Sequence, residues 1–207
     1  LGVSSHQIDA LERGFTFRSG APLDMRMGRA GVTAADVLNE YEEGELVRVL
    51  REYGEEPRAW PLVRRIAARR GSAPFRTSDD LVEVLESVYG HRLTPQDRAR
   101  VFQALRIEVN AELDSLDRAL PALRSRLEPR GVLVVIAYHS LEDRRVKNAF
   151  REWSRSCICP PDLPVCQCRG EPLGETLTRK IVRPTDEEVE RNPRARSARL
   201  RAWRKAA

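Results

Sequence analysis

VLVVIAYHSLEDRRVKNAFREW, residues 132–153, places a continuous apolar run directly before an amphipathic segment. Seven apolar residues rich in β-branched side chains predict a strand that is buried on both faces of a parallel sheet. Ser140 then predicts the N-cap of a helix, with Asp143 three residues further on. A buried strand, a tight turn and a helix in this order form half of a doubly wound α/β fold.

The segments on either side of this unit fit the same fold class. Thr94 and Pro95 predict the start of a long helix, whose apolar period continues to Leu120 and which Pro121 should end or bend. After it, TLTRKIV (176–182) predicts another strand. ARLRAW (198–203) alternates apolar residues with arginine, which predicts a half-exposed edge strand, with a short terminal helix as the alternative.

The N-terminal part of the chain carries a different pattern. LGVSS (1–5) is typical of the end of a buried strand that runs into a loop, and the chain up to Gly28 is loop-like. Four amphipathic stripes then predict helices, with caps at Thr33 and at Thr77. The third stripe begins near Trp60 and has an arginine-rich opposite face, which is either solvated or contacts RNA phosphates.

Composition excludes some classes of protein. The longest apolar run, seven residues, is far shorter than the roughly 20 residues of a membrane-spanning helix, and no stretch is typical of a signal peptide. The formal net charge is +5, and of the 36 basic residues only Lys147, Lys180 and Lys205 are lysines. The planar guanidinium suits phosphate and base stacking, so the charge permits a nucleic-acid partner, although a genome-wide preference for arginine would give the same composition.

All four cysteines fall in SCICPPDLPVCQC, at Cys157, Cys159, Cys166 and Cys168. Two Cys-x-Cys pairs could supply four thiolates to a structural zinc ion, although the spacing departs from the commoner Cys-x-x-Cys. A reduced loop without metal is the alternative. Catalytic thiol chemistry of the cytosine C5-methylating kind is disfavoured, because Cys159 precedes its proline rather than following it.

Ligands of open α/β sheets bind at the carboxyl ends of the strands. Two places in this sequence meet that description, residues 2–7 and residues 138–143. In the second, His139 and Glu142 are candidate functional residues, while Ser140 and Asp143 could equally be a helix cap. The sequence holds no glycine-rich phosphate loop, zincin helix or Gly-x-Ser-x-Gly elbow, so nucleophilic hydrolysis is unsupported.

Six separated blocks carry a family resemblance. They are LGVSSHQ (1–7), RGFTFR with PLDMRM (13–27), TAADVLN (33–39), FQALRIEVNAEL (102–113), VVIAYHSLEDRRVK (134–147) and NPRARSARLR (192–201). In this order they resemble the bacterial RsmH (MraW) family. That resemblance implies S-adenosylmethionine-dependent methylation of a cytosine N4 amine in small-subunit ribosomal RNA, in the cytoplasm.

The resemblance also implies a fold and a domain division. We expect a class I (Rossmann-like) methyltransferase sheet with an all-helical domain inserted after the fourth strand. Residues 1–28 would be the first part of the methyltransferase domain, 29–105 the inserted substrate-recognition domain, and 106–207 the second part. Family members carry a further segment before the Leu-Gly-Val-Ser-Ser block, with the first strands and most of the cofactor site. We therefore expect these 207 residues alone to be inactive and, with an uncovered sheet, to self-associate.

Several residue roles follow from the resemblance. Gln7, the last cofactor-contacting position of the family, and Gly2 are expected at the cofactor. Ser4 and Ser5 are expected beside the acidic catalytic residue that precedes the Leu-Gly-Val-Ser-Ser block in the family. For the substrate we expect Asn110, His139, Ser140 and Glu142 around the base, and Arg194 and Arg196 on the RNA backbone.

Two alternatives stay open. The chain could be a non-catalytic RNA-binding remnant without a complete cofactor site, because its arginine-rich surfaces would serve that function equally well. Methylation of DNA would keep the chemistry and change the substrate, and the resemblance argues against it.

Overall fold

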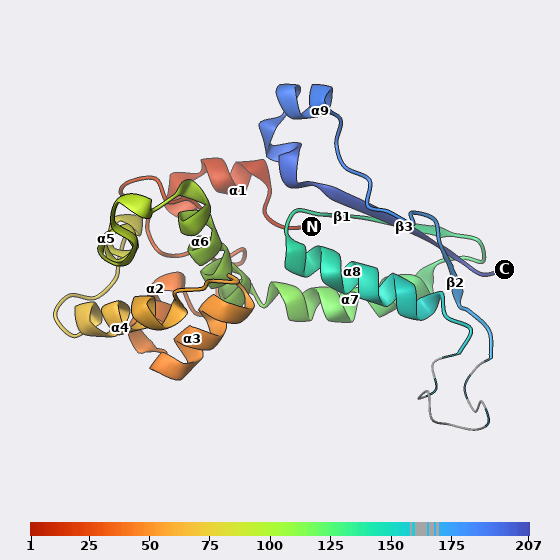
Figure 1. Cartoon of the computed structure of the whole chain (residues 1–207), viewed down its shortest axis with the longest axis horizontal. Helices are drawn as coiled ribbons and strands as arrows, with labels where there is room; N and C mark the ends of the chain where they lie inside the picture. The colour runs from red at the N-terminus through yellow and green to blue at the C-terminus, as the bar shows by residue number, and fades with distance from the viewer. Residues whose placement is uncertain (158, 160–164, 166–167, 169) are drawn as a thin grey trace. The chain divides into compact units, whose positions relative to one another are not determined.

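The computed structural model describes residues 1–157, 159, 165, 168 and 170–207. The chain forms two compact units, which we call the helical unit (Val3–Glu112) and the sheet unit (Leu1–Gly2 with Leu113–Ala207) (Figure 1). Among the described helices, none has both the length and the apolar character needed to cross a membrane. The described elements include both α-helices and β-strands, as the sequence predicts.

The helical unit is built from capped amphipathic helices. Thr33, Thr77 and Thr94 each form a capping box with an aspartate three residues later, which satisfies backbone N–H groups at the start of the helix. Pro95 occupies the first turn after Thr94, where its missing N–H costs nothing. The α-helices are α1 (Ser5–Asp9), α2 (Ala34–Glu40), α3 (Glu43–Glu52), α4 (Ala59–Arg70), α5 (Ser78–Tyr89) and α6 (Pro95–Asn110).

The apolar faces of α2 to α6 meet in one core. Its most buried members include Leu38, Leu50, Val63 and Leu85, each 0% exposed. These residues belong to the stripes that the sequence predicts. The four predicted helices of this region are therefore confirmed, and Trp60 lies outside the core at 44% exposure.

The long helix predicted from Thr94 to Leu120 is instead two helices. Ala111 adopts a left-handed conformation (φ 45°) and ends α6, and α7 (Glu112–Arg126) follows at once. Nothing in the local sequence signals this break, because alanine is a strong helix former. Pro121 neither ends α7 nor prevents it, and the helix continues for five residues beyond it.

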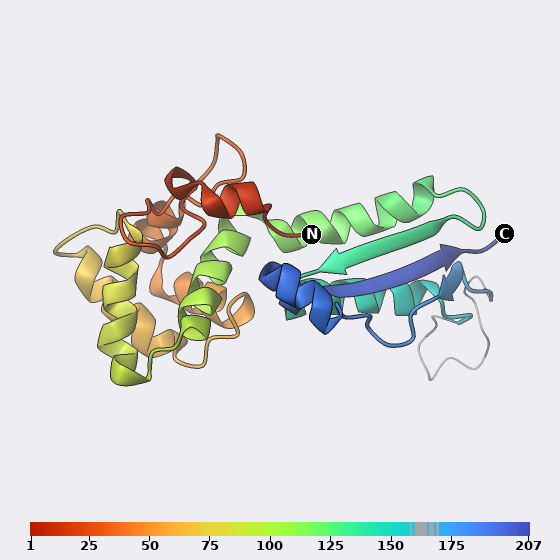
Figure 2. The same cartoon turned by 90° about the horizontal axis from the view of Figure 1, so that it is seen from above.

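Among its described residues, the sheet unit has three strands in the order β1-β3-β2, and neighbouring strands are antiparallel. Strand β1 (Val132–Ala137) pairs with β3 (Arg199–Lys205), which also pairs with β2 (Gly174–Thr176). Helices α7 and α8 (Ser140–Trp153) lie along one face of this sheet (Figures 1 and 2). The shared core comprises Leu116, Leu120, Val135, Val146, Phe150, Trp153 and Trp203.

Three strand predictions need correction in the described chain. Strand β1 is buried on one face only, because Val134 and Ile136 on the other face are 51% and 41% exposed, and its described neighbour is antiparallel. The 198–203 segment is a strand, but β3 is central rather than an edge. Of the predicted 176–182 strand only Thr176 lies in β2, and Val182 makes an isolated bridge to Leu200.

The chain start also differs from expectation. Residues 1–4 form no strand, and Leu1 is 45% exposed. The backbone nitrogen of Leu1 donates to the carbonyl of Ile136 at 2.9 Å, so this end of the chain reaches the free edge of β1.

Candidate functional site

The turn between β1 and α8 holds a group of polar side chains that contact one another and the backbone. His139, rather than the predicted Ser140, is the N-cap of α8, and its Nδ1 accepts from the backbone N–H of Glu142 at 3.4 Å. An accepting Nδ1 leaves the ring proton of a neutral imidazole on Nε2. The capping signal in the sequence was therefore correct in kind and displaced by one residue.

Glu142 is buried beneath this turn, at 3% exposure. Its Oε2 accepts from the backbone N–H of Tyr138 at 3.0 Å, and its Oε1 lies 3.4 Å from His139 Nε2. Burial raises the pKa of this carboxyl, but the contact with His139 and the Tyr138 N–H outweigh that effect, so the pKa lies below its ordinary value. The side chain is thus a buried carboxylate that faces the Nε2–H of His139.

Asp143 is held by β3 rather than by the helix cap predicted for it. Arg201 Nε donates to Asp143 Oδ1 at 2.6 Å and its Nη2 to Oδ2 at 3.0 Å, and Arg199 lies 3.5 Å from Oδ2. Burial raises the pKa of Asp143, but these arginines bring it below the ordinary value. The first turn of α8 is therefore fixed to the sheet by a two-pronged ion pair.

The N-terminal residues of the sheet unit lie at the same turn. Gly2 has φ +77°, and a Cβ placed on it would lie 3.9 Å from Glu142 Oε1. Together with the bond from Leu1 to Ile136, this brings the predicted cofactor residue Gly2 beside the predicted substrate residue Glu142.

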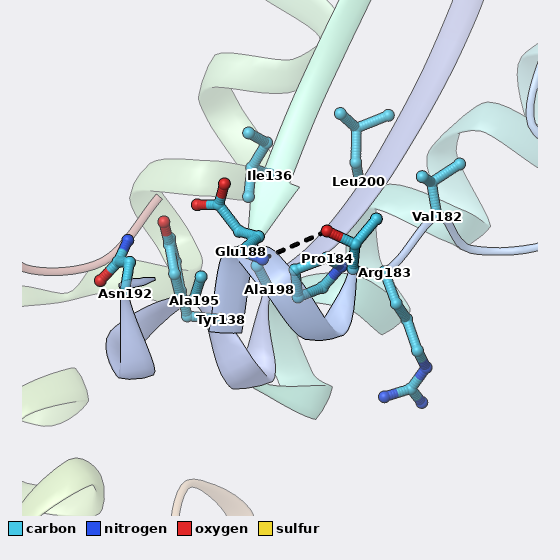
Figure 3. A pocket seen from close by; sticks show the side chains of 11 residues that line it. Ile136, Tyr138, Val182, Arg183, Pro184, Glu188, Asn192, Ala195, Ala198 and Leu200 are labelled. Atoms are coloured by element: carbon cyan, nitrogen blue, oxygen red, sulfur yellow. Dashed lines mark hydrogen bonds between the residues drawn. The ribbon is translucent and has the colours of Figure 1, made fainter. Parts of the chain in front are cut away.

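A pocket of about 360 Å³ opens where β1 ends (Figure 3). Tyr138 from the turn, and Arg183, Thr185, Glu188 and Asn192 from the α9 region, are its polar lining residues. Glu188 N–H donates to Thr185 Oγ1 at 3.2 Å. Helix α9 (Asp186–Arg191) is followed by a 3₁₀ turn, Pro193–Ser197. The lining residues are Ile136, Tyr138, Val182, Arg183, Pro184, Thr185, Glu188, Asn192, Ala195, Ala198 and Leu200.

Arg194 and Arg196 flank the pocket residue Ala195 in the 3₁₀ turn, and both are exposed. Sequence reasoning missed Tyr138, Glu188 and Asn192 as pocket residues. The family block at 192–201 contained Asn192, whereas nothing in the sequence pointed to Glu188.

The remaining predicted residues of the N-terminal block lie in the helical unit. Ser4 is the N-cap of α1, where its Oγ accepts from Gln7 N–H at 3.3 Å and its own N–H donates to Gln7 Oε1 at 2.9 Å. The Nε2 of Gln7 has no partner among the described residues, and Ser5 is exposed in the first turn. Their predicted roles in catalysis and cofactor binding stay predictions.

Asn110 has a clear structural role. Its Oδ1 accepts from Met27 N–H at 2.7 Å, and its Nδ2 donates to the carbonyls of Met25 and Arg106, each at 2.8 Å. Met25 has a positive φ of 61°, so the amide holds an uncommon backbone conformation. Any contact of Asn110 with a base stays a prediction.

The cysteine segment is described only in part. Cys157, Cys159 and Cys168 have their sulfur atoms within 4.8 Å of one another. Cys166 lies outside the described residues. Three clustered sulfur atoms fit part of the four-thiolate set that tetrahedral zinc prefers.

Comparisons with known proteins agree with one another. The model of the MraW methylase family matches residues 1–206. A protein of Gemmatimonas aurantiaca named ribosomal RNA small subunit methyltransferase H is 60% identical over all of this chain, which spans 66% of that relative. Relatives of the same name from Heliobacterium mobile and an Anaeromyxobacter species are 49% and 51% identical over 99% of the chain, which spans 67% of each.

Proposed function

This chain belongs to the MraW methylase family, and we propose that its protein transfers a methyl group from S-adenosylmethionine to the N4 amine of a cytosine in small-subunit ribosomal RNA. The observation that carries the proposal is the 60% identity, over the whole chain, to a relative named for methylation of that RNA. Use of the cofactor is implied by the family. We propose the cytoplasm as the location, because the proposed substrate is bacterial ribosomal RNA.

We propose the fold of the whole protein on the same basis. The sheet unit would be the end of a class I methyltransferase sheet, and residues 29–105 a helical substrate-recognition domain between parts 1–28 and 106–207. The exposed face and free edge of β1, and the all-helical character of the described residues 3–112, support this arrangement. A further segment would supply the first strands.

The reaction needs placement more than it needs a strong acid or base. The cofactor supplies an electrophilic methyl group when it is bound. Cytosine N4 is a poor nucleophile because its lone pair is delocalised into the ring, so an acceptor on the amine and a group that takes its proton would both help. An unpaired or flipped cytosine brings the amine to such groups.

We assign the surroundings of the base to the turn that follows β1. The pocket offers the face of Tyr138 for stacking and the amide of Asn192 for hydrogen bonds to a base edge. The buried pair of His139 and Glu142 would fix the Tyr138 backbone and hold a proton on His139 Nε2. Ser140 begins the helix that carries this pair, and Arg194 and Arg196 would contact phosphates at its rim.

The cofactor assignments rest on one observation for Gln7 and one for Gly2. The Nε2 of Gln7 has no described partner, and a Cβ added to Gly2 would make only an ordinary contact, at 3.9 Å, with Glu142 Oε1. Both groups would therefore fit the polar edge of a cofactor. Ser4 and Ser5 would stand next to the acidic residue that leads this block in the family.

We extend the proposal to zinc in the cysteine segment. The clustering of Cys157, Cys159 and Cys168 supports a metal ion with a structural role, with Cys166 as the fourth ligand expected from the sequence. Metal analysis of protein purified without chelator tests this directly. About one zinc per chain, lost after substitution of Cys157 and Cys159 by serine, is expected, and a metal-free native protein would contradict it.

Methyl transfer from radiolabelled S-adenosylmethionine tests the main proposal. The substrate is small ribosomal subunits from a bacterium whose own family member has been deleted. Two proteins are compared: the 207-residue chain, and a chimera completed with the remaining third of the Gemmatimonas aurantiaca relative. We expect transfer by the chimera only, with N4-methylcytidine as the product after digestion and mass spectrometry.

The other outcomes are equally clear. Transfer by the 207-residue chain alone would overturn the expectation that it is inactive. A chimera that binds ribosomal RNA without transfer and without binding the cofactor would favour the RNA-binding remnant. Transfer to DNA rather than RNA would change the substrate class.

A further inference from the structure

A second surface, on the helical unit, has the chemistry of a nucleic-acid contact. A groove of about 680 Å³ runs between α4 and the end of α5. Trp60, Arg64 and Arg65 are its large lining residues. The lining residues are Trp60, Pro61, Arg64, Arg65 and Ala68 from α4, and Ser87 and Val88 from α5.

Trp60 is conspicuous because it is not used in packing. It is 44% exposed, whereas Trp153 and Trp203 are 4% and 0% exposed. The core of the helical unit takes Leu62, Val63 and Ile66 from the same helix, so the indole lies on the opposite side of α4. An exposed aromatic ring of this size offers a flat stacking surface.

The two arginines beside it are also unused. Elsewhere on α4, Arg69 pairs with Asp80 and Glu83, and Arg70 donates to the carbonyls of Leu38 and Tyr41. Arg64 and Arg65 are exposed and have no ion pair or hydrogen bond with any described residue.

The carboxylates of α5 are engaged by other residues, Asp80 by Arg69 as above. Glu83 faces Arg69 at 3.1 Å, and Glu86 faces Arg98 at 3.0 Å. Asp79 accepts from Ser19 and from the Gly20 backbone. The groove therefore carries two positive charges without a neutralising acid from α5.

The spacing fits one nucleotide step. Residues four apart on a helix have Cβ atoms about 6 Å apart, so Arg64 stands one turn from Trp60 on the same side of α4. A base on the indole would have its own phosphate groups within reach of the two guanidinium groups, which bind phosphate in a forked geometry.

We propose that this Trp60 groove binds an unpaired nucleotide of the ribosomal RNA substrate, with the base stacked on Trp60 and flanking phosphates held by Arg64 and Arg65. The inference rests on the proposed function for the identity of the RNA. An acidic protein segment would use the arginines equally well, but it would leave the exposed face of the Trp60 indole without a stacking partner. The exposed indole therefore favours a base.

Tryptophan fluorescence can report on this groove selectively. The chain has three tryptophans, and the other two are buried. Titration of the dilute 207-residue chain with a short unstructured oligoribonucleotide should quench the exposed component. Trp60→Ala should weaken binding about ten-fold, and Trp60→Phe should retain most of it, because stacking on an aromatic face tolerates that change.

The salt dependence of RNA affinity tests the two arginines separately. Arg64→Gln with Arg65→Gln should reduce the slope of log affinity against log salt by about 1.4, the value for two phosphate contacts on a single strand. Arg51→Gln, at an exposed position on α3, is the matched control and should leave the slope unchanged.

Unchanged affinity and slope in these variants, or no quenching on RNA binding, would overturn the inference. Equal quenching by an acidic polypeptide at the same salt concentration would replace RNA with a protein partner. The chimera of the methyl-transfer assay separates the two proposals. Transfer with wild-type affinity in Trp60→Ala overturns only the groove, whereas loss of both transfer and RNA binding in the unsubstituted chimera overturns the function.

Discussion

Asp143 and Arg201 form a two-pronged ion pair that joins the first turn of α8 to the middle of β3, across 58 residues of sequence. Each residue is 8% exposed. Asp143 lies in the same first turn of α8 as Glu142, which follows the N-cap His139, so the pair fixes the start of the helix that carries them. Asp143, one residue after the proposed site residue Glu142, thus has a structural partner of its own.

Removal of the arginine should be costly, because a buried carboxylate would lose its partner. We expect Arg201→Met to lower the free energy of unfolding by about 3 kcal/mol. The pKa of Asp143 is lowered in the folded chain, so the pair contributes stability above the ordinary carboxyl pKa. This contribution should disappear as the pH falls through the folded pKa, and urea unfolding at a series of pH values measures it.

Arg204→Met is the matched control. Arg204 lies on the same strand as Arg201 and pairs with Glu175 of β2 at 3.2 Å. The side chains of Arg204 and Glu175 are 47% and 64% exposed. Such a pair contributes at most about 1 kcal/mol. Equal losses in the two variants would mean that the buried pair has no special role.

Local periodicity predicted the elements of the site, but not their partners. The apolar run of β1 and the 3.6-residue period of α8 gave both elements, and a cap was expected within one residue of His139. The antiparallel neighbour of β1 and the contact of Asp143 with Arg201 depend on residues far along the chain. Ala111 adopts a left-handed conformation that its residue type disfavours, so no local signal could have divided α6 from α7.

The structural role of Asn110 can be separated from its predicted contact with the substrate. Its amide makes three hydrogen bonds, two of them to the loop that contains Met25 and Met27. Asn110→Ala should lower the free energy of unfolding by about 2 kcal/mol, because backbone groups of the loop lose partners. Thermal unfolding measures this effect. A variant of full stability that has lost methyl transfer in the completed chimera would instead indicate direct contact with substrate.

A buried tyrosine in the core of the helical unit, Tyr89, should make the free energy of unfolding fall at alkaline pH. Tyr89 donates to Glu56, which is 2% exposed, and burial together with this carboxylate raises the pKa of Tyr89 to about 12. The phenol is therefore harder to ionise in the folded chain than in the unfolded chain. Its contribution should be complete below the ordinary pKa near 10 and lost as the pH rises towards 12.

Tyr89→Phe tests this interpretation. The variant removes the hydroxyl donor to the buried Glu56 carboxylate, which keeps the Arg58 N–H at 2.7 Å. A hydrogen bond to a charged group contributes about 2 kcal/mol, and we expect a loss of that size at neutral pH. It should also flatten the fall in stability at alkaline pH. Tyr53→Phe, at a half-buried tyrosine, is the control. The same alkaline fall in wild type and Tyr89→Phe would contradict the assignment.

Glu142 should matter for activity more than for folding. Glu142→Gln keeps an acceptor for Tyr138 N–H but removes the charge that faces His139. In the completed chimera we expect single-turnover methyl transfer to fall about ten-fold or more, since misplacement of the base by a fraction of an ångström is costly. Glu175→Gln on β2 is the control for charge, because Glu175 is exposed. Unchanged transfer in Glu142→Gln would remove this residue from the site.

The open face of β1 should make the 207-residue chain associate with itself. Val132, Val134, Ile136 and Tyr138 form a stripe that is 41–51% exposed, and among the described residues only Leu1 bonds to the free edge of β1. Exposed strands with apolar faces pair with other chains. Sedimentation velocity should therefore detect concentration-dependent oligomers. Val134→Lys should shift the chain towards monomer, because a charge would then lie in the centre of the stripe.

Leu123→Lys provides the comparison that makes this result specific. Leu123 is 47% exposed and belongs to α7 rather than to β1, so its substitution adds the same charge without altering the stripe. If both lysine variants dissolve the oligomers equally, net charge and not the β1 face controls association. If the completed chimera is monomeric while the 207-residue chain is not, the added segment covers this face, as the proposed methyltransferase sheet requires.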